Sequence, residues 1–427
     1  MKTIKSPKER SLSGSKELRN TVTEIIEEVR LRGDKALLEF SMRFDSSKRD
    51  SLKVELCELT EALKLLDGGL KNAMERALRN IRAFALAQRK SLRNIERFSP
   101  EPGLVIGQRL LPVESCLCYI PGGNFPLFST ALMLVTPAKV AGVRRVVACS
   151  PVMHGQASIH PVTLAALALA GADEVYALGG AQAIAAFAYG TEQIPPCDLI
   201  VGPGNEFVAE AKRQCYGQVG IDFIAGPSEV LIIADDRAKA GFIAADLLAQ
   251  CEHDVNAQAT LVTTSARLAE SVIKKIESEL AALETVKTAG ISWAERGGIY
   301  LAETLDEAAA FANSRAPEHL ELQTCENKRL VSKLYNYGAL FDGEYAAEVF
   351  GDYVAGTNHT LPTSGAARYT GGLGVGTFLK TVCFQKASPK SASRLAPFAA
   401  TLANAEGLCA HRNAAEQRLI NHKKPLR

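Results

Sequence analysis

The chain has 427 residues, enough for two or three domains around a large buried core. It carries 49 Lys and Arg against 47 Asp and Glu, a net charge of +2. This balance excludes a strong electrostatic footprint for nucleic acid or an anionic membrane, and it suits a small neutral or zwitterionic substrate. The ten cysteines form no CxxC pair, the N-terminus has no apolar signal segment, and no stretch approaches a membrane span. The sequence therefore predicts a soluble, cytoplasmic protein.

The first part of the chain, residues 16 to about 98, is predicted to be helical. Apolar residues recur there at helical spacing with charges between them, first at Leu18, Val22, Ile25, Ile26 and Val29, then over a second run from Leu56 to Leu92. This region contains no histidine and little that suggests chemistry.

From Leu111 onward, short β-branched runs alternate with Ala-rich stretches, and Gly or Pro closes most of the runs. The runs predict strands at 116–120, 145–150, 174–178, 198–201, 230–234 and 259–264, with helices between them at 131–142, 160–170 and 181–189. Such alternation of apolar strands with helices is typical of parallel sheets covered on both faces. Ligands in such folds gather where the carboxyl ends of strands meet helix N-termini.

The predicted fold is therefore α/β, with two Rossmann-like parallel-sheet domains, a helical N-terminal arm and a helical C-terminal tail. The expected limits are 1–110 for the helical region, 111–229 for the first α/β domain, 230–385 for the second and 386–427 for the tail.

Two of the segments that contain histidine offer groups for chemistry near regular structure. In DLLAQCEHD, Gln250 and His253 lie three apart near a predicted helix end and share one face, so they are able to reach one ion; a helix-end histidine bonded to backbone is the commoner arrangement. In APEHLEL, Pro317 predicts an extended Ala316, with Glu318 and His319 at a strand entrance. That pair is suited to proton transfer near pH 7, although the same sequence is equally compatible with a surface turn.

Two further segments contain histidine in less regular sequence. Asp352 and His359 fall in a Gly-, Thr- and Pro-rich stretch that predicts a loop, either functional or a mobile linker. Glu406 and His411 lie five apart in the C-terminal helix, where Gly407 interrupts the pattern. The amide, imidazole and carboxylate groups of the four segments suit Zn²⁺ or Mn²⁺. Composition and spacing alone lead only to an α/β enzyme with a candidate metal site.

The order of several long motifs resembles the histidinol dehydrogenase family over residues 100 to 420. The motifs are CYIPGG, LGGAQAIAA, VGPGNEFVAEAK, DFIAGPSEVLIIAD, DLLAQCEHD, APEHLEL, GDYVAGTNHTLPTSGAAR and AEGLCAH. The resemblance implies a zinc-dependent, NAD-linked oxidation of a primary alcohol, L-histidinol, through its aldehyde to a carboxylate, L-histidine. Because the chain has no GxGxxG fingerprint, NAD is implied by the resemblance alone.

Carried over position by position, the resemblance implies a role for each of thirteen residues. It implies zinc ligands at Gln250, His253, Asp352 and His411, an acid/base pair at Glu318 and His319, substrate contacts at Ser129, Ser228, His359 and Glu406, and NAD contacts at Tyr119, Gln182 and Asn205. The zinc ligands and His319 would also touch the substrate. The resemblance further implies a homodimer in which the tail, with Glu406 and His411, completes the site of the neighbouring subunit. A neutral His319 and an ionised Glu318 would suit neutral to mildly alkaline pH.

Two stretches depart from the family pattern. Asn124 and Phe125 follow the PGG motif where small residues are usual, so Phe125 either narrows a pocket or belongs to the core. The stretch YTGGLGVGTF is richer in glycine than in most biosynthetic members, and its glycines (Gly371, Gly372, Gly374, Gly376) make it more permissive. Two alternatives therefore stay open: a paralogue that oxidises another primary alcohol, such as a sulfonated diol, and a zinc hydrolase or silent binding protein.

Overall fold

The computed structural model describes residues 1–8, 16–122 and 125–419. The chain divides into two compact units. Unit 1 comprises residues 1–88 and 113–378, and unit 2 comprises residues 89–112 and 379–427. The α/β fold with two parallel sheets is confirmed, and both of these sheets lie in unit 1. The four-part division of the chain stays a prediction.

The N-terminal helices form where the apolar spacing predicts them. They are α1 (Lys16–Arg32), α2 (Asp34–Asp45), α3 (Leu56–Leu65) and α4 (Gly68–Ser91). All five apolar residues of the first run are buried on one side of α1, which packs against the first sheet's helices α7 (Gly180–Tyr189) and α8 (Glu206–Cys215). Burial of this apolar stripe stabilises the arm far more than helix propensity does.

The first sheet is parallel throughout and has the strand order β6-β5-β4-β7-β8. Its strands are β4 (Ser115–Tyr119), β5 (Arg145–Ser150), β6 (Glu174–Ala177), β7 (Leu199–Val201) and β8 (Gly220–Ile221). The connecting helices are α5 (Ser129–Ala141), α6 (Pro161–Ala170), α7 and α8. Every residue of β4 is buried, as expected for a central strand with helices on both faces.

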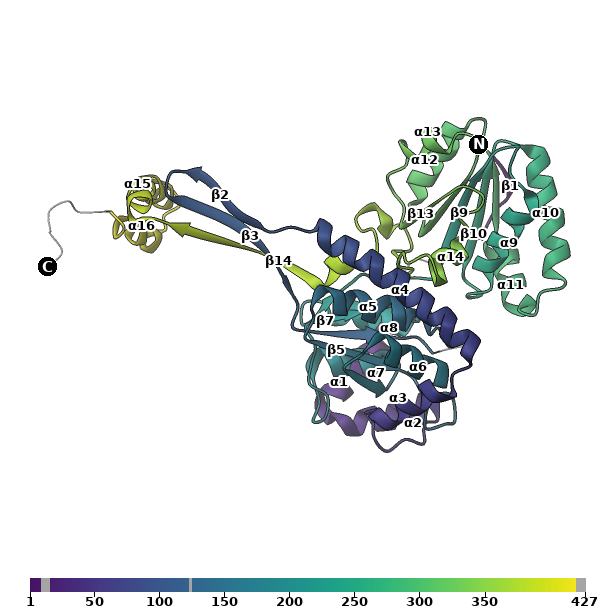
Figure 1. Ribbon diagram of the computed structural model, residues 1–427, viewed down its shortest axis with the longest axis horizontal. Coiled ribbons are helices and arrows are strands. Elements are labelled where there is room, and N and C mark those ends of the chain that lie inside the picture. Colours follow the sequence, from purple (N-terminus) through teal and green to yellow (C-terminus); the bar gives the residue numbers. More distant parts are fainter. Residues whose placement is uncertain (9–15, 123–124, 420–427) are drawn as a thin grey trace. The chain divides into compact units, whose positions relative to one another are not determined.

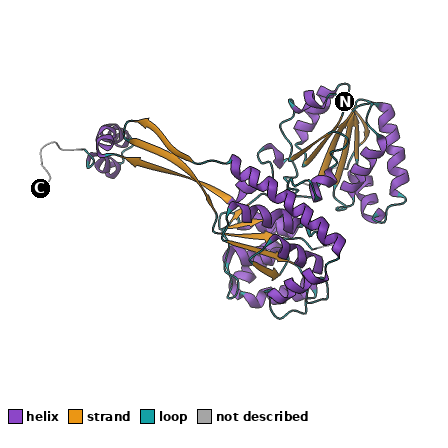
Figure 2. Ribbon diagram, in the orientation of Figure 1, coloured by secondary structure: helices purple, strands orange, loops and turns teal. Residues whose placement is uncertain are grey.

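The second sheet has the order β1-β11-β10-β9-β12-β13, and all its strands are parallel except β1 at the edge. Its strands are β1 (Lys2–Lys5), β9 (Glu229–Ala234), β10 (Gln258–Thr263), β11 (Gly298–Leu301), β12 (His319–Gln323) and β13 (Ala339–Asp342). Its helices are α9 (Ala240–Cys251), α10 (Ala266–Leu280), α11 (Val286–Arg296), α12 (Leu305–Arg315), α13 (Asn327–Val331) and α14 (Glu348–Tyr353), followed by the 3₁₀ turns η1 (Ala366–Arg368) and η2 (Val375–Phe378). Helices cover both faces of the sheet (Figure 2), with one apolar core against α9, α10 and α11 and another against α12 and α13.

Unit 2 contains an antiparallel sheet that the sequence does not predict. It consists of β2 (Ile95–Glu101), β3 (Leu104–Pro112) and β14 (Leu379–Ala387), in the order β14-β3-β2. The expectation that residues 1–110 are helical is therefore wrong for 95–110. The predicted helical tail is confirmed within the described residues by α15 (Pro389–Ala405) and α16 (Cys409–Glu416), which pack against each other (Figure 1).

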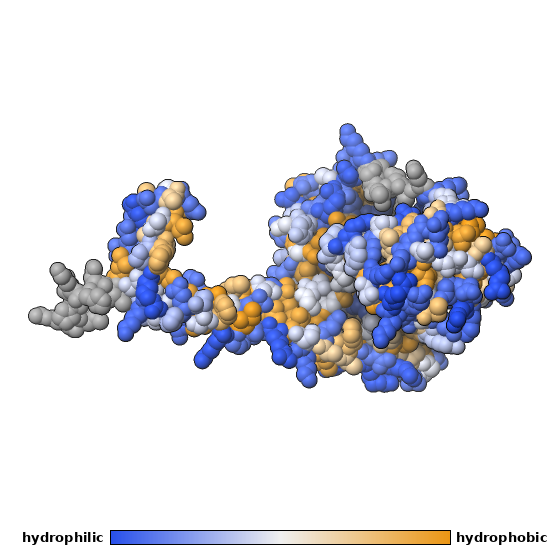
Figure 3. Space-filling view, turned by 90° about the horizontal axis from the view of Figure 1, so that it is seen from above, coloured by the Kyte–Doolittle hydropathy of each residue, from blue (hydrophilic) through white to orange (hydrophobic). Residues whose placement is uncertain are grey.

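Unit 2 is thin and leaves many apolar side chains exposed. Orange patches in Figure 3 mark apolar residues on its surface, and the exposed ones include Ile95, Phe98, Leu111, Phe398 and Leu402. Exposed apolar area on this scale is typical of a surface that another chain covers. No helix within the described ranges is both long and apolar enough to cross a membrane.

Candidate active site

The predicted acid/base pair lies at the amino end of β12 and is fixed by the neighbouring strand. Glu318 is 5% exposed and His319 is 3% exposed. The backbone of Glu229, the first residue of β9, contacts both side chains: its N–H donates to Glu318 Oε2 (2.9 Å), and its carbonyl oxygen lies 3.3 Å from His319 Nδ1. The first residue of a central strand thus orients both groups.

The residue before Pro317 differs from the expectation. Ala316 is not extended but has φ 52° and ψ 61°, in the left-handed region. It ends helix α12, and its N–H donates to the carbonyl of Ala312 (2.8 Å). The need to reverse the chain from α12 into β12 within three residues outweighs the usual preference before proline.

The surroundings of His319 hold its imidazole neutral. Burial, followed by the nearby His253, lowers the pKa of His319 to about 3. Nδ1 faces two acceptors, the Glu229 carbonyl and Glu348 Oε1, each at 3.3 Å, so Nδ1 is the nitrogen that carries the proton. Nε2 is buried without a hydrogen-bond partner in the described part of the chain. Its lone pair is therefore available to accept a proton.

Glu318 is a stronger base than an ordinary glutamate. Burial, and then the charges of Glu229 and Asp352, raise the pKa of Glu318 well above its usual value, although hydrogen bonds from the Glu229 backbone and the Ser228 side chain oppose the shift. The ionised form therefore requires a higher pH than the sequence alone suggests. A base whose pKa is raised towards the working pH transfers protons more effectively.

Three of the four predicted zinc ligands come together beside this pair. Gln250 is fully buried near the end of α9, and His253 follows that helix. His253 Nε2 lies 3.9 Å from Asp352 Oδ2, and the other carboxylate oxygen of Asp352 lies 3.9 Å from His319 Nε2. Asp352 is not in a loop, as predicted, but in the short helix α14, and burial raises its pKa to about 7.

Glu348 belongs to this cluster, and the sequence analysis missed it. One ligand atom from each of His253, Glu348 and Asp352 lies within 4.8 Å of the others. Glu348 is 5% exposed, and its backbone N–H donates to Glu321 Oε1 (3.0 Å), which fixes the start of α14. The signal was the i,i+4 spacing of Glu348 and Asp352, visible only if this stretch is taken as a helix.

The chemistry of these groups fits a divalent cation. In one amide orientation the Gln250 NH₂ group donates to both Glu348 oxygens, at 2.6 and 3.1 Å. In the other, the Gln250 oxygen faces two carboxylate oxygens, a contact that a shared cation would stabilise. An amide, an imidazole and carboxylates form a borderline-hard ligand set of the kind that binds zinc.

The residues predicted to contact substrate are divided between the two units. His359 Nε2 lies 3.4 Å from Thr130 Oγ1 on α5, next to the buried Ser129, and burial lowers the pKa of His359 to about 4. Ser228 contacts Glu318 and thus joins the acid/base pair. In unit 2, Glu406 ends α15 and Gly407, with φ 76°, separates it from α16, which carries the exposed His411. The predicted interruption at Gly407 is confirmed, whereas the full four-ligand set stays a prediction.

The departures from the family pattern are partly accounted for. Phe125 is 41% exposed, so it does not belong to the core, and Asn124 lies outside the described residues. The loop that carries the four glycines is not loose: Leu373 N–H donates to the Thr360 carbonyl (2.9 Å), and a Cβ on Gly372 would meet Leu361 Cδ2 at 2.7 Å. Close packing against the segment after His359 thus requires glycine at this position.

The predicted NAD contacts gather at the carboxyl end of the first sheet. Tyr119 ends β4, and its hydroxyl accepts a hydrogen bond from Gly180 N–H (3.0 Å) at the start of α7. Gln182 is 1% exposed, and its Oε1 has no partner in the described residues. Asn205 caps α8 by accepting from Val208 N–H (3.1 Å). An orphaned amide beside two helix N-termini fits a dinucleotide, whose amide and pyrophosphate bind such groups.

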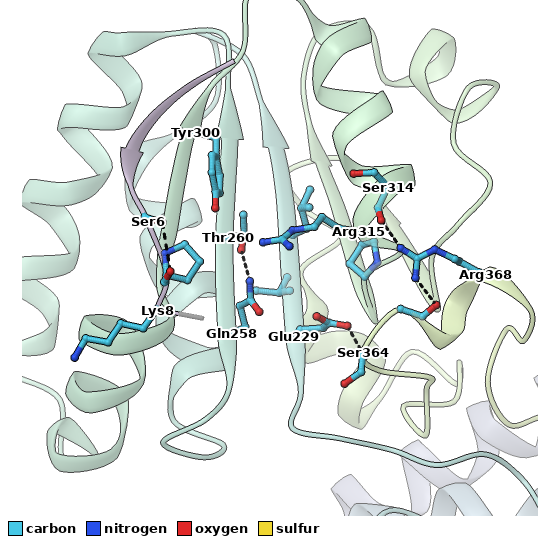
Figure 4. Close-up of a pocket in the computed structure, with 15 residues that line it drawn as sticks. Ser6, Lys8, Glu229, Gln258, Thr260, Tyr300, Ser314, Arg315, Ser364 and Arg368 are labelled. Carbon is cyan, nitrogen blue, oxygen red and sulfur yellow. Dashed lines mark hydrogen bonds between the residues drawn. The ribbon is translucent and has the colours of Figure 1, made fainter. Parts of the chain in front are cut away.

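A cavity of about 500 Å³ opens at the amino end of the second sheet (Figure 4). Leu231, Thr260 and Tyr300 line it from the strands, and Arg315 and Arg368 line it from the far side. By strand register, Leu231 and Thr260 point away from the face that carries His319. Glu229 and Pro317 also line the cavity, so it adjoins the amino end of β12 beside the predicted catalytic residues.

Two parallel sheets, a buried acid/base pair and an adjoining cluster of imidazole and carboxylates define an α/β enzyme. The model of the histidinol dehydrogenase family matches residues 8–419. The chain therefore belongs to the histidinol dehydrogenase family and is an oxidoreductase that acts on an alcohol or aldehyde. The prediction of the family is confirmed, and the alternative of a hydrolase or silent binding protein loses its support.

Relatives resemble the chain over almost its whole length. It is 45% identical over 397 residues to a histidinol dehydrogenase of Bradyrhizobium diazoefficiens, covering 92% of this chain and 91% of the relative. It is 43% identical over 413 residues to histidinol dehydrogenase homolog 1 of Mesorhizobium japonicum, covering 96% and 82%. The crystal structure of histidinol dehydrogenase from Elizabethkingia anophelis matches with a TM-score of 0.91 and 36% identity, covering 96% of this chain and 94% of that one.

Proposed function

We propose that this protein catalyses the zinc-dependent, NAD-linked oxidation of L-histidinol through L-histidinal to L-histidine. The observation that carries the proposal is the buried His319, whose ring lies between Glu318 and the carboxylates of α14 and whose Nε2 has no hydrogen-bond partner among the described residues. Relatives that are 44–45% identical over more than nine-tenths of the chain are named histidinol dehydrogenases, which supports the same substrate here.

Two groups complete the proposed site. Zinc, held by Gln250, His253 and Asp352 with His411 of the partner subunit, would orient the amine and ring nitrogen of the alcohol. NAD, held by Tyr119, Gln182 and Asn205, would accept the hydride that leaves in each of the two oxidations.

The residues of the chain then handle the protons. His319 Nε2 accepts the hydroxyl proton of the alcohol as its C–H hydride leaves, which gives the aldehyde. Glu318 takes a proton from water, and the hydroxide adds to the aldehyde to form the hydrate as its monoanion. His319, once it has released its first proton, accepts a proton from the hydrate as the second hydride leaves, which gives the carboxylate. The low pKa of His319 keeps it neutral before each step, and the hydrogen bond from Glu229 N–H keeps Glu318 in place.

We further propose that the active form is a homodimer. The supporting observation is that α15 and α16 expose Phe398, Leu402 and Leu408, an apolar surface that a second copy would cover. In this arrangement Glu406 and His411 would complete the partner's site.

A second candidate keeps the same chemistry but changes the alcohol. Relatives of Mesorhizobium japonicum and Shouchella clausii, 42–43% identical, are named only as histidinol dehydrogenase homologs. The glycine-rich stretch after Arg368 also favours a paralogue that oxidises another primary alcohol, such as a sulfonated diol.

The deciding experiment is NADH formation by zinc-loaded protein with L-histidinol at alkaline pH. Two NADH per alcohol consumed, lost on chelation and in His319→Asn, is the result that the proposal requires. No NADH from a folded, zinc-bound protein would reject histidinol, and turnover of another primary alcohol by the same preparation would establish the second candidate.

A further inference from the structure

A buried ion pair lies beside the proposed NAD contacts, and no step of the proposed reaction uses it. Lys212, on α8, has a side chain that is 2% exposed, and its ammonium group contacts the carboxylate of Asp222, whose side chain is fully buried. Removing two charges from water costs more than their attraction returns unless further hydrogen bonds satisfy them. The further hydrogen bonds of Lys212 and Asp222 therefore indicate what the ion pair stabilises.

Both charged groups bind the backbone of the same residue, Gly202. Lys212 Nζ donates to the carbonyl oxygen of Gly202 (2.9 Å), and the N–H of Gly202 donates to Asp222 Oδ2 (2.8 Å). Gly202 has φ 116°, and a Cβ there would meet the Tyr119 carbonyl oxygen at 2.3 Å. The pair thus holds a residue that only glycine can occupy, directly against Tyr119.

This residue opens the turn that carries a proposed NAD contact. Gly202 follows β7, and three residues later Asn205 caps α8. Lys212 lies in the same helix, so the ammonium group reaches back to the start of the turn that precedes its own helix. The turn is therefore fixed at Gly202 by the ion pair and at Asn205 by the helix cap.

Asp222 also fixes the path between the two sheets. Its Oδ1 accepts a hydrogen bond from Phe223 N–H (2.7 Å). Phe223 begins the segment that runs from β8 to β9 and contains Ser228. One carboxylate thus ties the turn after β7 to the segment that leads to Ser228.

We propose that Lys212 and Asp222 are positioning residues that hold the turn 202–205, and through it Asn205, for the dinucleotide. This inference rests on the proposed NAD-linked function. A purely structural pair would change stability alone, whereas a positioning pair also sets cofactor affinity.

The test compares two variants with a matched control. Lys212→Met removes the ammonium group, and Lys212→Met combined with Asp222→Asn leaves no unpaired buried charge, so it remains foldable if the single variant does not. The control is Arg145→Met, which breaks the 2.7 Å contact with Glu174 at the amino end of the same sheet. Dissociation constants for NADH are measured by fluorescence titration, and hydrogen exchange is followed across residues 202–208.

The proposal requires that the double variant bind NADH at least tenfold more weakly than the wild type and exchange faster across residues 202–208. The control should bind within twofold, with unchanged exchange there. A folded double variant that binds NADH with wild-type affinity would overturn the proposal, whatever its exchange rate. If the wild type itself does not bind NADH, the proposed cofactor fails and the positioning role fails with it, so the two failures are told apart by the titration of the wild type.

Discussion

Asp352→Asn is expected to stabilise the metal-free protein at pH 8 while abolishing zinc binding. Burial raises the pKa of Asp352 from 3.8 to about 7. A carboxyl group whose pKa is raised in the folded state contributes its full stabilisation only below its unfolded pKa, about 4, and loses it as the pH rises through about 7. At pH 8 that loss is complete. Asparagine carries no charge to bury, so the variant does not lose this stability at pH 8.

The size of the expected gain in stability follows from the pKa shift of Asp352. The pKa of Asp352 rises from 3.8 to about 7, a shift of about three units. At about 1.4 kcal/mol per unit, the stability that the variant can gain at pH 8 is at most about 4 kcal/mol. The Asp352 side chain is 14% exposed, so water screens part of this cost, and we expect a gain of about 2 kcal/mol. For the compact unit that contains Asp352, residues 1–88 and 113–378, an unfolding entropy of about 2.1 cal/mol/K per residue converts this gain into a rise in Tm of about 3 °C.

The assay is calorimetry of wild type and variant with a chelator at pH 8 and pH 5, repeated with zinc. The advantage of the variant should shrink at pH 5, where the folded wild type keeps its proton. Zinc at about a hundredfold over its Kd should raise the stability of the wild type by about 2.7 kcal/mol and leave the variant unchanged. The exposed Asp236→Asn serves as control and should stay within about 0.5 kcal/mol of wild type. A variant less stable than the chelated wild type at pH 8 would refute this reasoning.

Three further predictions concern catalysis, cofactor and assembly. Glu318→Gln removes the proposed base for water and should lower kcat by about 10²–10⁴ in steady-state NADH assays. It should not lower Tm, because the variant no longer buries a carboxyl group whose pKa is raised. A lower Tm with an unchanged kcat would contradict this prediction. Gln182→Leu should weaken NADH binding at least tenfold in a titration, since it removes the orphaned buried amide; wild-type affinity would exclude the assignment. Mixing inactive His319→Asn and His411→Ala subunits should restore about a quarter of wild-type activity through mixed dimers with one intact site, and no recovery after subunit exchange would reject the shared site.

The α/β core could be predicted from the sequence because its strands are buried on both faces. β4, β5 and β9 are short apolar runs, and such runs carry the strand signal without alternation. β2 carries no such signal, since all seven of its residues are exposed and no buried face imposes an apolar pattern. Its only partner among the described strands is β3, which also pairs with β14, a strand more than 260 residues further along the chain.

The candidate site could be predicted only in part. The segments containing Gln250, Glu318 and Asp352 were identified from their local residue types and from the resemblance. Their meeting depends on where α9, β12 and α14 lie around one end of the second sheet, which local spacing does not encode. The contacts from the backbone of Glu229 could not be predicted either, because every residue type except proline offers the same backbone N–H and carbonyl groups.

In the proposed site the two parallel sheets use opposite ends, and one carboxylate gives a reason for this difference. A dinucleotide normally binds beyond the carboxyl ends of the strands where the strand order reverses, which in the second sheet lies between β9 and β12. There Asp235 follows β9, and its carboxylate accepts hydrogen bonds from Cys325 N–H (2.6 Å), beyond β12, and Arg237 N–H (3.0 Å). These amides are the donors that a pyrophosphate would need, and the carboxylate would repel its charge. The corresponding end of the first sheet carries the proposed NAD contacts Tyr119, Gln182 and Asn205 instead, and this arrangement would leave the second sheet to supply Glu318 and His319 from its amino end.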